Sequence, residues 1–243
     1  MRHSSFTNIA HRGASAYAPE NTLAAFDKAL DLGAGHVEFD VHFSADGQVV
    51  VIHDDTVDRT TNGSGAVASH TLAQLKRLDA GSWFAGQFSG ERIPTLGEVL
   101  KRYKGKLHFH IEVKGRAEHL SERTIDLVRG YGWPDSVTIT SFQKERLEEA
   151  RAYAPAIPAG WLTREVDESM VEQARQMGLA EICPHADFLD GELVERLHQK
   201  GFMVRAFGVR DEEVMRRVVE AGADGMTIDF PDRLASYLKS GPA

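Results

Sequence analysis

The sequence has little cysteine: Cys183 is the only one in 243 residues, so an intrachain disulfide is excluded. A single thiol is compatible with a reducing compartment. The amino-terminal residues lack the apolar core of a signal peptide, and no stretch is long and apolar enough to span a bilayer. These absences favour a cytoplasmic protein without a membrane span.

The sequence also lacks an excess of positive charge. Lys and Arg number 28 against 36 Asp and Glu, which gives a formal net charge of −8 at pH 7. Nonspecific nucleic-acid binding needs clustered cations that neutralise phosphates, so this balance argues against a nucleic-acid partner. It leaves an anionic small-molecule substrate open, because a bound metal ion can reverse the local sign of the charge. The oligomeric state is left open as well.

Short apolar runs alternate with helical patterns along most of the chain. We expect strands at residues 8–11, 36–43, 48–53, 107–113, 136–140, 157–162, 180–184, 202–207 and 225–228. The first helix is expected to begin after Asn21, a suitable cap, and to end near Gly33. Further helical patterns cover residues 96–103, 118–131, 143–153, 168–177, 191–200 and 211–221.

This alternation predicts an α/β protein with a parallel sheet. With residues 48–53 counted as an extension of the second strand, the pattern favours a TIM (β/α)8 barrel that forms one domain over residues 1–243. Residues from about 54 to 94 are less regular, and we interpret them as a small insertion. A doubly wound open sheet is the alternative. No Gly-x-Gly-x-x-Gly loop follows the first strand, so a dinucleotide site gets no support.

Ionisable side chains gather at the carboxyl ends of the predicted strands, where the active sites of TIM barrels lie. Glu38 and Asp40 are two residues apart and therefore share one side of their strand, while their apolar neighbours take the other. Glu112 and Lys114 repeat this arrangement. If the apolar neighbours face the helices, the carboxylates and the lysine converge on the barrel axis.

Buried carboxylates repel one another, and a hard divalent cation with oxygen ligands removes this cost. We therefore predict one divalent cation, Mg²⁺ or Ca²⁺, held by Glu38, Asp40 and Glu112. With Arg12 and Lys114 added, the site carries a small positive formal charge, which suits a phosphodiester monoanion. Arg12 can bind it with its planar fork, and Lys114 can act as a point charge.

His11 and His53 end two of the predicted strands. Cleavage of a P–O bond to an alkoxide leaving group needs one proton given and another taken, and histidine does both near neutral pH. A lone histidine at a strand end is more often structural, so the prediction depends on all these residues sharing one end of neighbouring strands. The pattern does not decide which histidine acts as the base in the first step.

Other conspicuous residues receive structural interpretations. Cys183 is expected to be a packed core thiol, and Trp83 and Phe84 are expected to pack the insertion. No role is assigned to the histidines at six further positions: His3, His36, His42, His70, His119 and His198.

An ordered set of short motifs covers almost the whole chain. It comprises HRG at 11–13, PENT at 19–22, VEFDV at 37–41, HD at 53–54, LDAGSWF at 78–84, IPTL at 93–96, IEVK at 111–114, SF at 141–142 and TIDFP at 227–231. In this order and with this content, the chain resembles the glycerophosphodiester phosphodiesterases. Each motif is weak alone, and the ordered set is highly specific.

The resemblance implies a TIM barrel with a small insertion after the second strand and a metal bound by Glu38, Asp40 and Glu112. It implies His11 and His53 as the acid–base pair. It also implies metal-dependent hydrolysis of glycerophosphodiesters to glycerol 3-phosphate and an alcohol. In the implied mechanism, the free glycerol hydroxyl next to the phosphate attacks phosphorus to give a cyclic phosphate, which water then opens.

The chain departs from the family near the seventh barrel strand. A Trp-Thr pair followed shortly by Asn is usual there, whereas this sequence has Phe207-Gly208-Val209-Arg210. We expect Phe207 to form part of the wall of the substrate pocket. The smaller aromatic ring and the missing hydroxyl should change this wall near the leaving alcohol more than near the phosphoryl group. For Arg210 we favour a cap on a surface loop over an anion contact.

Two alternatives stay open at this point. A phospholipase D-like enzyme acting on lysolipids or sphingolipids would use a similar set of residues, but the sequence shows no basic amphipathic helix that demands a membrane surface. A barrel that binds a phosphodiester or metal without turnover is the other. The presence of both histidines and all three carboxylates argues against it.

Overall fold

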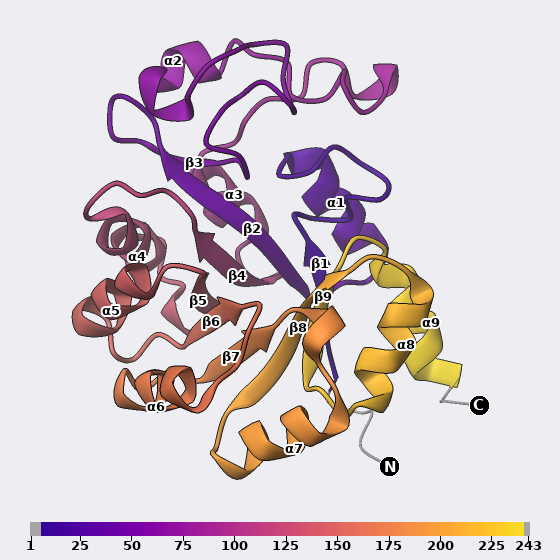
Figure 1. Ribbon diagram of the computed structural model, residues 1–243. Helices are drawn as coiled ribbons and strands as arrows, with labels where there is room; N and C mark the ends of the chain where they lie inside the picture. Colours follow the sequence, from indigo (N-terminus) through magenta and orange to yellow (C-terminus); the bar gives the residue numbers. More distant parts are fainter. Residues whose placement is uncertain (1–5, 241–243) are drawn as a thin grey trace.

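The computed structural model describes residues 6–240, most of which form a closed barrel surrounded by helices (Figure 1). Within these residues, parallel strands pair in the order β1-β9-β8-β7-β6-β5-β4-β2, and β1 pairs with β2 to close the ring. The strands are β1 (Thr7–His11), β2 (His36–Phe43), β3 (Val49–Val51), β4 (His108–Val113), β5 (Val137–Ser141), β6 (Ala159–Thr163), β7 (Glu181–Pro184), β8 (Met203–Val209) and β9 (Gly225–Ile228). The predicted TIM barrel is confirmed.

Helices cover the outside of the barrel wall. The α-helices are α1 (Leu23–Asp31), α2 (Leu72–Leu75), α3 (Leu96–Tyr103), α4 (Leu120–Gly130), α5 (Lys144–Tyr153), α6 (Glu168–Gln176), α7 (Gly191–Gln199), α8 (Glu212–Glu220) and α9 (Pro231–Ser240). Short 3-10 helices are η2 (Val67–Ser69), η3 (Gly86–Phe88), η4 (Pro134–Ser136) and η5 (Ala186–Phe188). Within the described residues, every helix is too short or too polar to cross a membrane.

Side-chain alternation along β2 separates the two faces of the barrel wall. Val37 and Phe39 are fully buried in the main core, and the centroid of the Phe39 ring lies 5.6 Å from that of Phe26 in α1. Glu38 lines a cavity inside the barrel, as the period of two requires. The expected division into an apolar outer face and an acidic inner face is confirmed for this strand.

The start of α1 differs from the prediction. Thr22, not Asn21, is the N-cap, and its hydroxyl accepts a 3.3 Å hydrogen bond from the backbone N–H of Ala25. Asn21 adopts a left-handed backbone with φ 58°, which asparagine tolerates better than most residues. Its side-chain amide donates a 2.9 Å hydrogen bond to Asp40. Asn21 therefore ties the loop before α1 to the acidic inner face of β2.

The extension predicted for the second strand is also different in the structure. Residues Val49–Val51 form the separate strand β3, which runs antiparallel to the end of β2, with Val41 opposite Val51. The turn at residues 44–47 reverses the chain, so Val49–Val51 lie outside the barrel ring. The barrel nevertheless reaches eight strands within residues 6–240, because residues 48–53 were not needed for that number.

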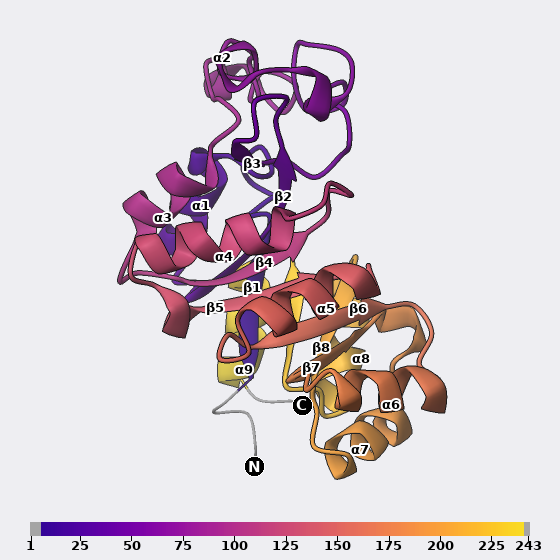
Figure 2. The ribbon, with the colours of Figure 1, turned by 90° about the vertical axis from the view of Figure 1, so that its left-hand side faces the viewer.

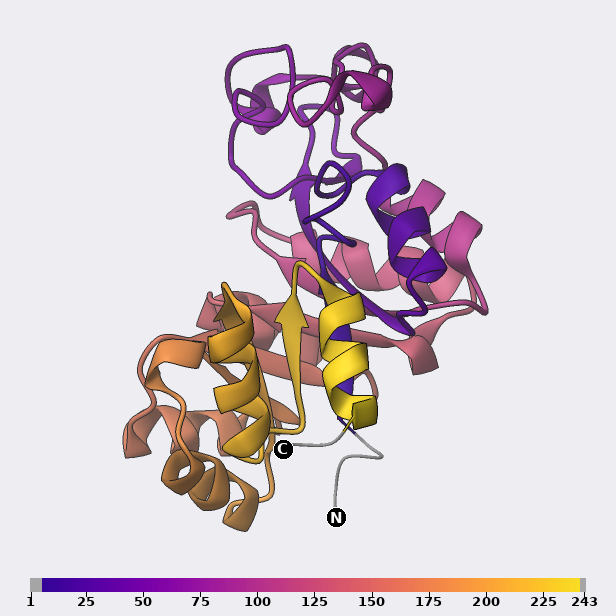
Figure 3. The same cartoon turned by 90° about the vertical axis from the view of Figure 1, so that its right-hand side faces the viewer.

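The segment after β3 has a small core of its own. This second cluster contains the buried residues Val50, Ile52, Val57, Val67, Leu75, Ala80 and Ile93. Figures 2 and 3 show the segment standing off the barrel beyond the arrowhead of β2. Trp83 packs edge-on against Phe84, which packs on Phe88, although Trp83 stays 40% exposed. The segment predicted as an insertion at about 54–94 therefore lies beyond the carboxyl end of β2.

Helix α9 was not predicted. It begins at Pro231, a residue suited to a first helical turn, and packs against β1 (Figure 3). Leu234 of α9 is fully buried in the main core. The helix therefore covers the seam where the last barrel strand meets the first.

Gly13 allows a close approach between the β1–α1 loop and α1. Its φ is 85°, and an added Cβ would lie 2.6 Å from the backbone carbonyl carbon of Ala25. Gly33 has a similar φ of 78° but open space around the same position. The pair therefore separates the cost of backbone conformation from the cost of a clash.

We expect Gly13→Ala to lower the free energy of unfolding by roughly 2–5 kcal/mol, since left-handed strain and overpacking add together. Gly33→Ala should lose only about 1–2 kcal/mol from the strain alone. Urea unfolding at equilibrium measures both. Equal losses in the two variants would show that the close approach to Ala25 does not matter.

Candidate active site

Three carboxylates meet at the carboxyl ends of β2 and β4. Asp40 lies directly opposite Glu112 in the strand register, and Glu38 is two residues before Asp40. Their exposed fractions are 5% for Glu38, 1% for Asp40 and 6% for Glu112. A carboxylate oxygen of each residue lies within 4.8 Å of one from each of the others. The convergence predicted from strand spacing is confirmed.

The cluster shifts the acidity of its own members. Burial, followed by the charge of Asp40, raises the pKa of Glu112 to about 8 and also raises the pKa of Glu38. Burial alone would raise the pKa of Asp40, but the charges of Arg12 and His53 outweigh it and lower that pKa. The buried carboxylates therefore resist carrying their full charge at neutral pH without a counter-charge.

One oxygen of the cluster is both fully buried and without a hydrogen-bond partner among residues 6–240. Asp40 Oδ1 is buried and accepts no hydrogen bond, and Lys114 Nζ is 3.8 Å away. Lys114 instead donates to Glu112 at 3.2 Å. A buried anionic oxygen without a partner is costly, and oxygens of this kind are the ligands that hard divalent cations prefer. The residues present thus fit a divalent metal ion.

Two histidines flank the cluster, and each is oriented by a carboxylate. His11 Nδ1 donates a 2.6 Å hydrogen bond to Asp229, and His53 Nδ1 donates one of 2.6 Å to Asp54. His11 Nε2 lies 3.9 Å from Glu38. A ring held through Nδ1 has a fixed tautomer and uses Nε2 for chemistry. Both predicted histidines therefore line the same cavity as members of the acidic cluster, and each ring is held through Nδ1.

The environments of the two histidines differ. Burial lowers the pKa of His53. Burial and the charge of Arg12 would also lower the pKa of His11, but Asp229 and Glu38 outweigh them and raise it. A second contact fixes the loop around His53, because His42 Nε2 donates to its backbone carbonyl at 3.1 Å. His42, which received no role from sequence, therefore positions this loop.

Arg12 is held by a network that reaches the insertion. Its Nη1 donates to Glu20 at 2.7 Å, while its Nε lies 3.5 Å from Asp40. Arg59, from the insertion, donates to Glu20 and to Asp54, both at 2.7 Å. This chain of ion pairs connects the loop that follows His11 with the loop that carries His53. Arg12 itself has a left-handed backbone, φ 55°, at the end of β1.

A cavity of about 370 Å³ opens above these groups. It is lined by both histidines, Arg12, Lys114, Glu38 and Glu112, and also by Phe142, Leu162, Arg164, Arg205 and Phe207. The rings of Phe142 and Phe207 meet edge to face with centroids 5.1 Å apart, and Lys114 Nζ lies 5.8 Å from the centroid of the Phe142 ring. The lining thus combines charged groups with a pair of aromatic rings.

Residues 11–233 match the model of the glycerophosphoryl diester phosphodiesterase family. The chain belongs to this family. A putative glycerophosphodiester phosphodiesterase of Bacillus subtilis, YhdW, is 39% identical over 92% of this chain and 94% of that protein. A glycerophosphodiester phosphodiesterase of Caldanaerobacter subterraneus is 38% identical over 96% and 98%.

Solved structures agree with the family assignment. A phosphodiesterase of Oleispira antarctica, in complex with the product sn-glycerol-3-phosphate, has a TM-score of 0.90 and 33% identity over 97% of each chain. A glycerophosphodiester phosphodiesterase of Agrobacterium tumefaciens has a TM-score of 0.86 and 31% identity over 96% of this chain and 100% of that one.

Phe207 and Gly208 stand where the family resemblance leads one to expect a Trp-Thr pair, and the structure shows which neighbour limits the space at position 208. Gly208 has φ 75°, and an added Cβ would lie 2.4 Å from Nε2 of His185. The ring of His185 also meets that of Phe207 at a centroid distance of 5.0 Å. A histidine from the loop after β7 therefore fills the space that a threonine side chain would need. Arg210 lies beyond the cavity and pairs with Asp187 on the surface.

Sequence reasoning missed the partners more often than the principal residues. Asp229 directly follows the last predicted strand and received no role from the sequence, yet barrel closure pairs Ala10 with Ile228 and so brings Asp229 beside His11. A closed barrel places the ends of its first and last strands side by side, and this was the signal that could have identified Asp229. Arg59 and His185 had no such signal, because each comes from an irregular segment. Cys183 is fully buried, as expected, and burial raises the pKa of its thiol to about 12.

We expect Glu112→Gln to stabilise the metal-free protein by about 1–3 kcal/mol at pH 8, because it removes a buried charge from a repulsive cluster. A raised carboxyl pKa means that the folded state loses stability as the pH rises from about 4.5 to 8, and the variant should lose this dependence.

The same variant should abolish the stabilisation by added Mg²⁺ or Ca²⁺. Thermal unfolding of metal-stripped protein, with and without added cation, measures both effects. Glu192→Gln, in the first turn of α7, is the control for removal of an ordinary acidic residue. A metal-free Glu112→Gln protein less stable than the parent at pH 8 would contradict the repulsion.

Proposed function

We propose that the chain hydrolyses glycerophosphodiesters to glycerol 3-phosphate and an alcohol. The observation that carries the proposal is a pair of carboxylate-held histidines, His11 and His53, beside a buried acidic cluster in one cavity. Family membership supports the reaction class, and the Oleispira antarctica relative was solved with sn-glycerol-3-phosphate.

Glu38, Asp40 and Glu112 would hold one divalent cation, either Mg²⁺ or Ca²⁺. All their donor atoms are carboxylate oxygens, which both ions prefer over nitrogen or sulfur. When bound, the cation supplies positive charge that neutralises the phosphoryl oxygens and the cluster itself. Lys114, which contacts Glu112, and Arg12, whose Nε is buried without a hydrogen-bond partner among the described residues, would bind the phosphate.

The first step would be an attack by the substrate on itself. The glycerol hydroxyl next to the phosphate forms a new O–P bond, and one histidine accepts the proton of that hydroxyl. The bond from phosphorus to the alcohol oxygen breaks, and the other histidine gives this oxygen a proton. The products of this step are a cyclic glycerol phosphate and the free alcohol.

The second step would reverse the proton transfers. After the first step, one histidine has gained a proton and the other has lost one. The histidine without the proton accepts one from a water molecule as the oxygen of that water attacks phosphorus. The other protonates the glycerol oxygen as the ring opens to glycerol 3-phosphate. Asp229 and Asp54 would hold the two rings through Nδ1 in both steps.

Metal-stripped enzyme should release no glycerol 3-phosphate from glycerophosphocholine or glycerophosphoethanolamine, and added Mg²⁺ or Ca²⁺ should restore release. His11→Ala and His53→Ala should each lower kcat by about 10²–10⁴-fold, the usual contribution of an acid or base. An enzyme-coupled assay of glycerol 3-phosphate measures both effects, and the more effective ion identifies the cofactor.

His198→Ala is the matched control, because His198 is a surface histidine also paired with a carboxylate, that of Asp224, at 2.7 Å. Lysophosphatidylcholine tests the lipid alternative in the same experiment. Turnover of the lysolipid without turnover of the water-soluble diesters would overturn the proposed substrate. Tight binding of both with no product at any metal concentration would leave only a binding protein.

The aromatic rings of Phe142 and Phe207 should contribute to binding of the leaving alcohol. We expect Phe207→Ala to raise KM for glycerophosphocholine about 10-fold while kcat changes less than about 3-fold, because it removes apolar contact remote from phosphorus. Phe188→Ala is the control, since Phe188 is 59% exposed and contacts His185 from outside the cavity. Steady-state kinetics decide the point: a fall in kcat at unchanged KM would place Phe207 in the chemical step.

A further inference from the structure

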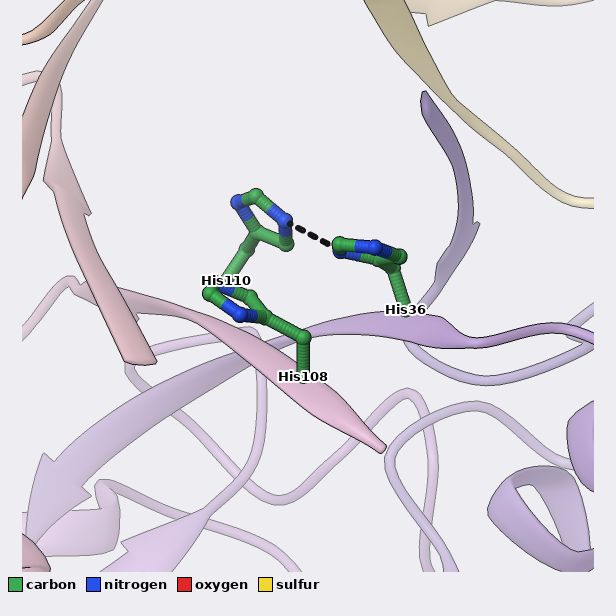
Figure 4. Close-up of side chains that lie close together, drawn as sticks. All are labelled: His36, His108 and His110. Carbon is green, nitrogen blue, oxygen red and sulfur yellow. Dashed lines mark hydrogen bonds between the residues drawn. The ribbon is translucent and has the colours of Figure 1, made fainter. Parts of the chain in front are cut away.

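A second group of histidines lies at the other end of the barrel. His36 is the first residue of β2 and His108 the first of β4, and His110 follows on the same side of β4 (Figure 4). In the strand register, His36 is opposite His108, and His110 is opposite Glu38. The three rings therefore lie on the amino-terminal side of Asp40 and Glu112, with His110 level with Glu38 of the acidic cluster.

The three rings have the mutual spacing of ligands on one metal ion. Their centroids lie 4.9, 5.0 and 5.5 Å apart, and one ring nitrogen of each is within 4.8 Å of the others. His36 Nδ1 is 3.3 Å from His110 Nε2, which is long for a hydrogen bond. Two nitrogens bound tetrahedrally at about 2.0–2.1 Å from one Zn²⁺ lie roughly 3.3–3.4 Å apart.

The surroundings hold one of the rings and leave a buried nitrogen of another without a partner among the described residues. Thr138 is 3.1 Å from His108 Nε2 and can fix the orientation of that ring, leaving Nδ1 as its metal-binding atom. His110 is 97% buried, and its Nδ1 has no hydrogen-bond partner within the described part of the chain. All three histidines line a mostly apolar cavity of about 260 Å³, which has room for an ion and a further ligand.

The charge state of the group suits a cation that prefers nitrogen. Burial, with smaller effects of His36 and Arg205, lowers the pKa of His108 to about 4, so this ring keeps its lone pair at neutral pH. Arg205 lines the same cavity, but its Nε donates to Glu181 at 3.1 Å, so the pair is close to neutral. Arg205 lines the active-site cavity as well, and its Nη atoms have no hydrogen-bond partner among residues 6–240.

We propose that His36, His108 and His110 form a second metal site, separate from the acidic cluster, which binds Zn²⁺ through three imidazole nitrogens. Imidazole suits zinc, whereas Mg²⁺ and Ca²⁺ prefer oxygen, so the two ends of the barrel select different classes of ion. The bound ion would join the first residues of β2 and β4. Its effect would be to stabilise the two strands that position Glu38, Asp40 and Glu112.

The test uses Zn²⁺ alone as the probe, with excess Mg²⁺ present to occupy the acidic cluster. Equilibrium dialysis followed by elemental analysis should find one bound zinc per chain in the parent. The same stoichiometry should persist in a His11→Asn/Glu112→Gln variant, which removes ligands from the active-site end. Addition of His108→Asn to that variant should abolish binding, while His198→Asn, a surface control, should leave it unchanged.

X-ray absorption of the zinc-loaded parent gives a readout that needs no variant to fold. A tetrahedral shell with three imidazole nitrogens at about 2.0–2.1 Å is expected. Zinc should also raise the thermal unfolding temperature in the presence of excess Mg²⁺, and His108→Asn should lose this shift. An oxygen-only shell would overturn the proposal. So would zinc retained in the variant with His108→Asn, or zinc lost in the His11→Asn/Glu112→Gln variant.

Discussion

The burial of like charges on neighbouring strands is the constraint on which the active-site end of this molecule depends. The register of β2 and β4 sets Asp40 against Glu112, and a period of two adds Glu38 from the same strand. Every polar contact around them opposes the resulting repulsion: Asn21 donates to Asp40, Lys114 donates to Glu112, and the backbone N–H of Arg12 donates to Glu38. The loops after β1 and β4 are therefore organised by charge as much as by packing.

The insertion is joined to this arrangement through charge too. Arg59 contacts both Glu20, from the loop after β1, and Asp54, the partner of His53. The insertion has its own apolar core, so it can present Arg59 from a packed base rather than from a loose loop. The insertion, although it lies outside the barrel, thus links the loop that follows His11 to the loop that carries His53.

The barrel and the principal residues of the site could be predicted because both follow from local periodicity. Alternation along β2 and β4 decides which side chains face inward, and it needs no knowledge of distant contacts. The errors occurred where a long-range partner decided the outcome. Asn21 is not the N-cap of α1, and its side chain instead donates a hydrogen bond to Asp40. Residues 49–51 pair antiparallel with the end of β2. Asp229 lies beside His11 only because β1 pairs with β9. Secondary-structure propensity and residue spacing are local properties, so they do not predict these long-range contacts.

The contact between Gly208 and His185 restricts how the pocket wall can diversify. A Cβ at position 208 would meet the imidazole at 2.4 Å, so a side chain there is incompatible with the histidine in its present place. A side chain at position 208 therefore requires that His185 be rotated away or replaced, and it also carries the strain of a left-handed backbone. The two positions, 23 residues apart in the chain, are sterically coupled, so the residue that fits at one depends on the residue and rotamer at the other.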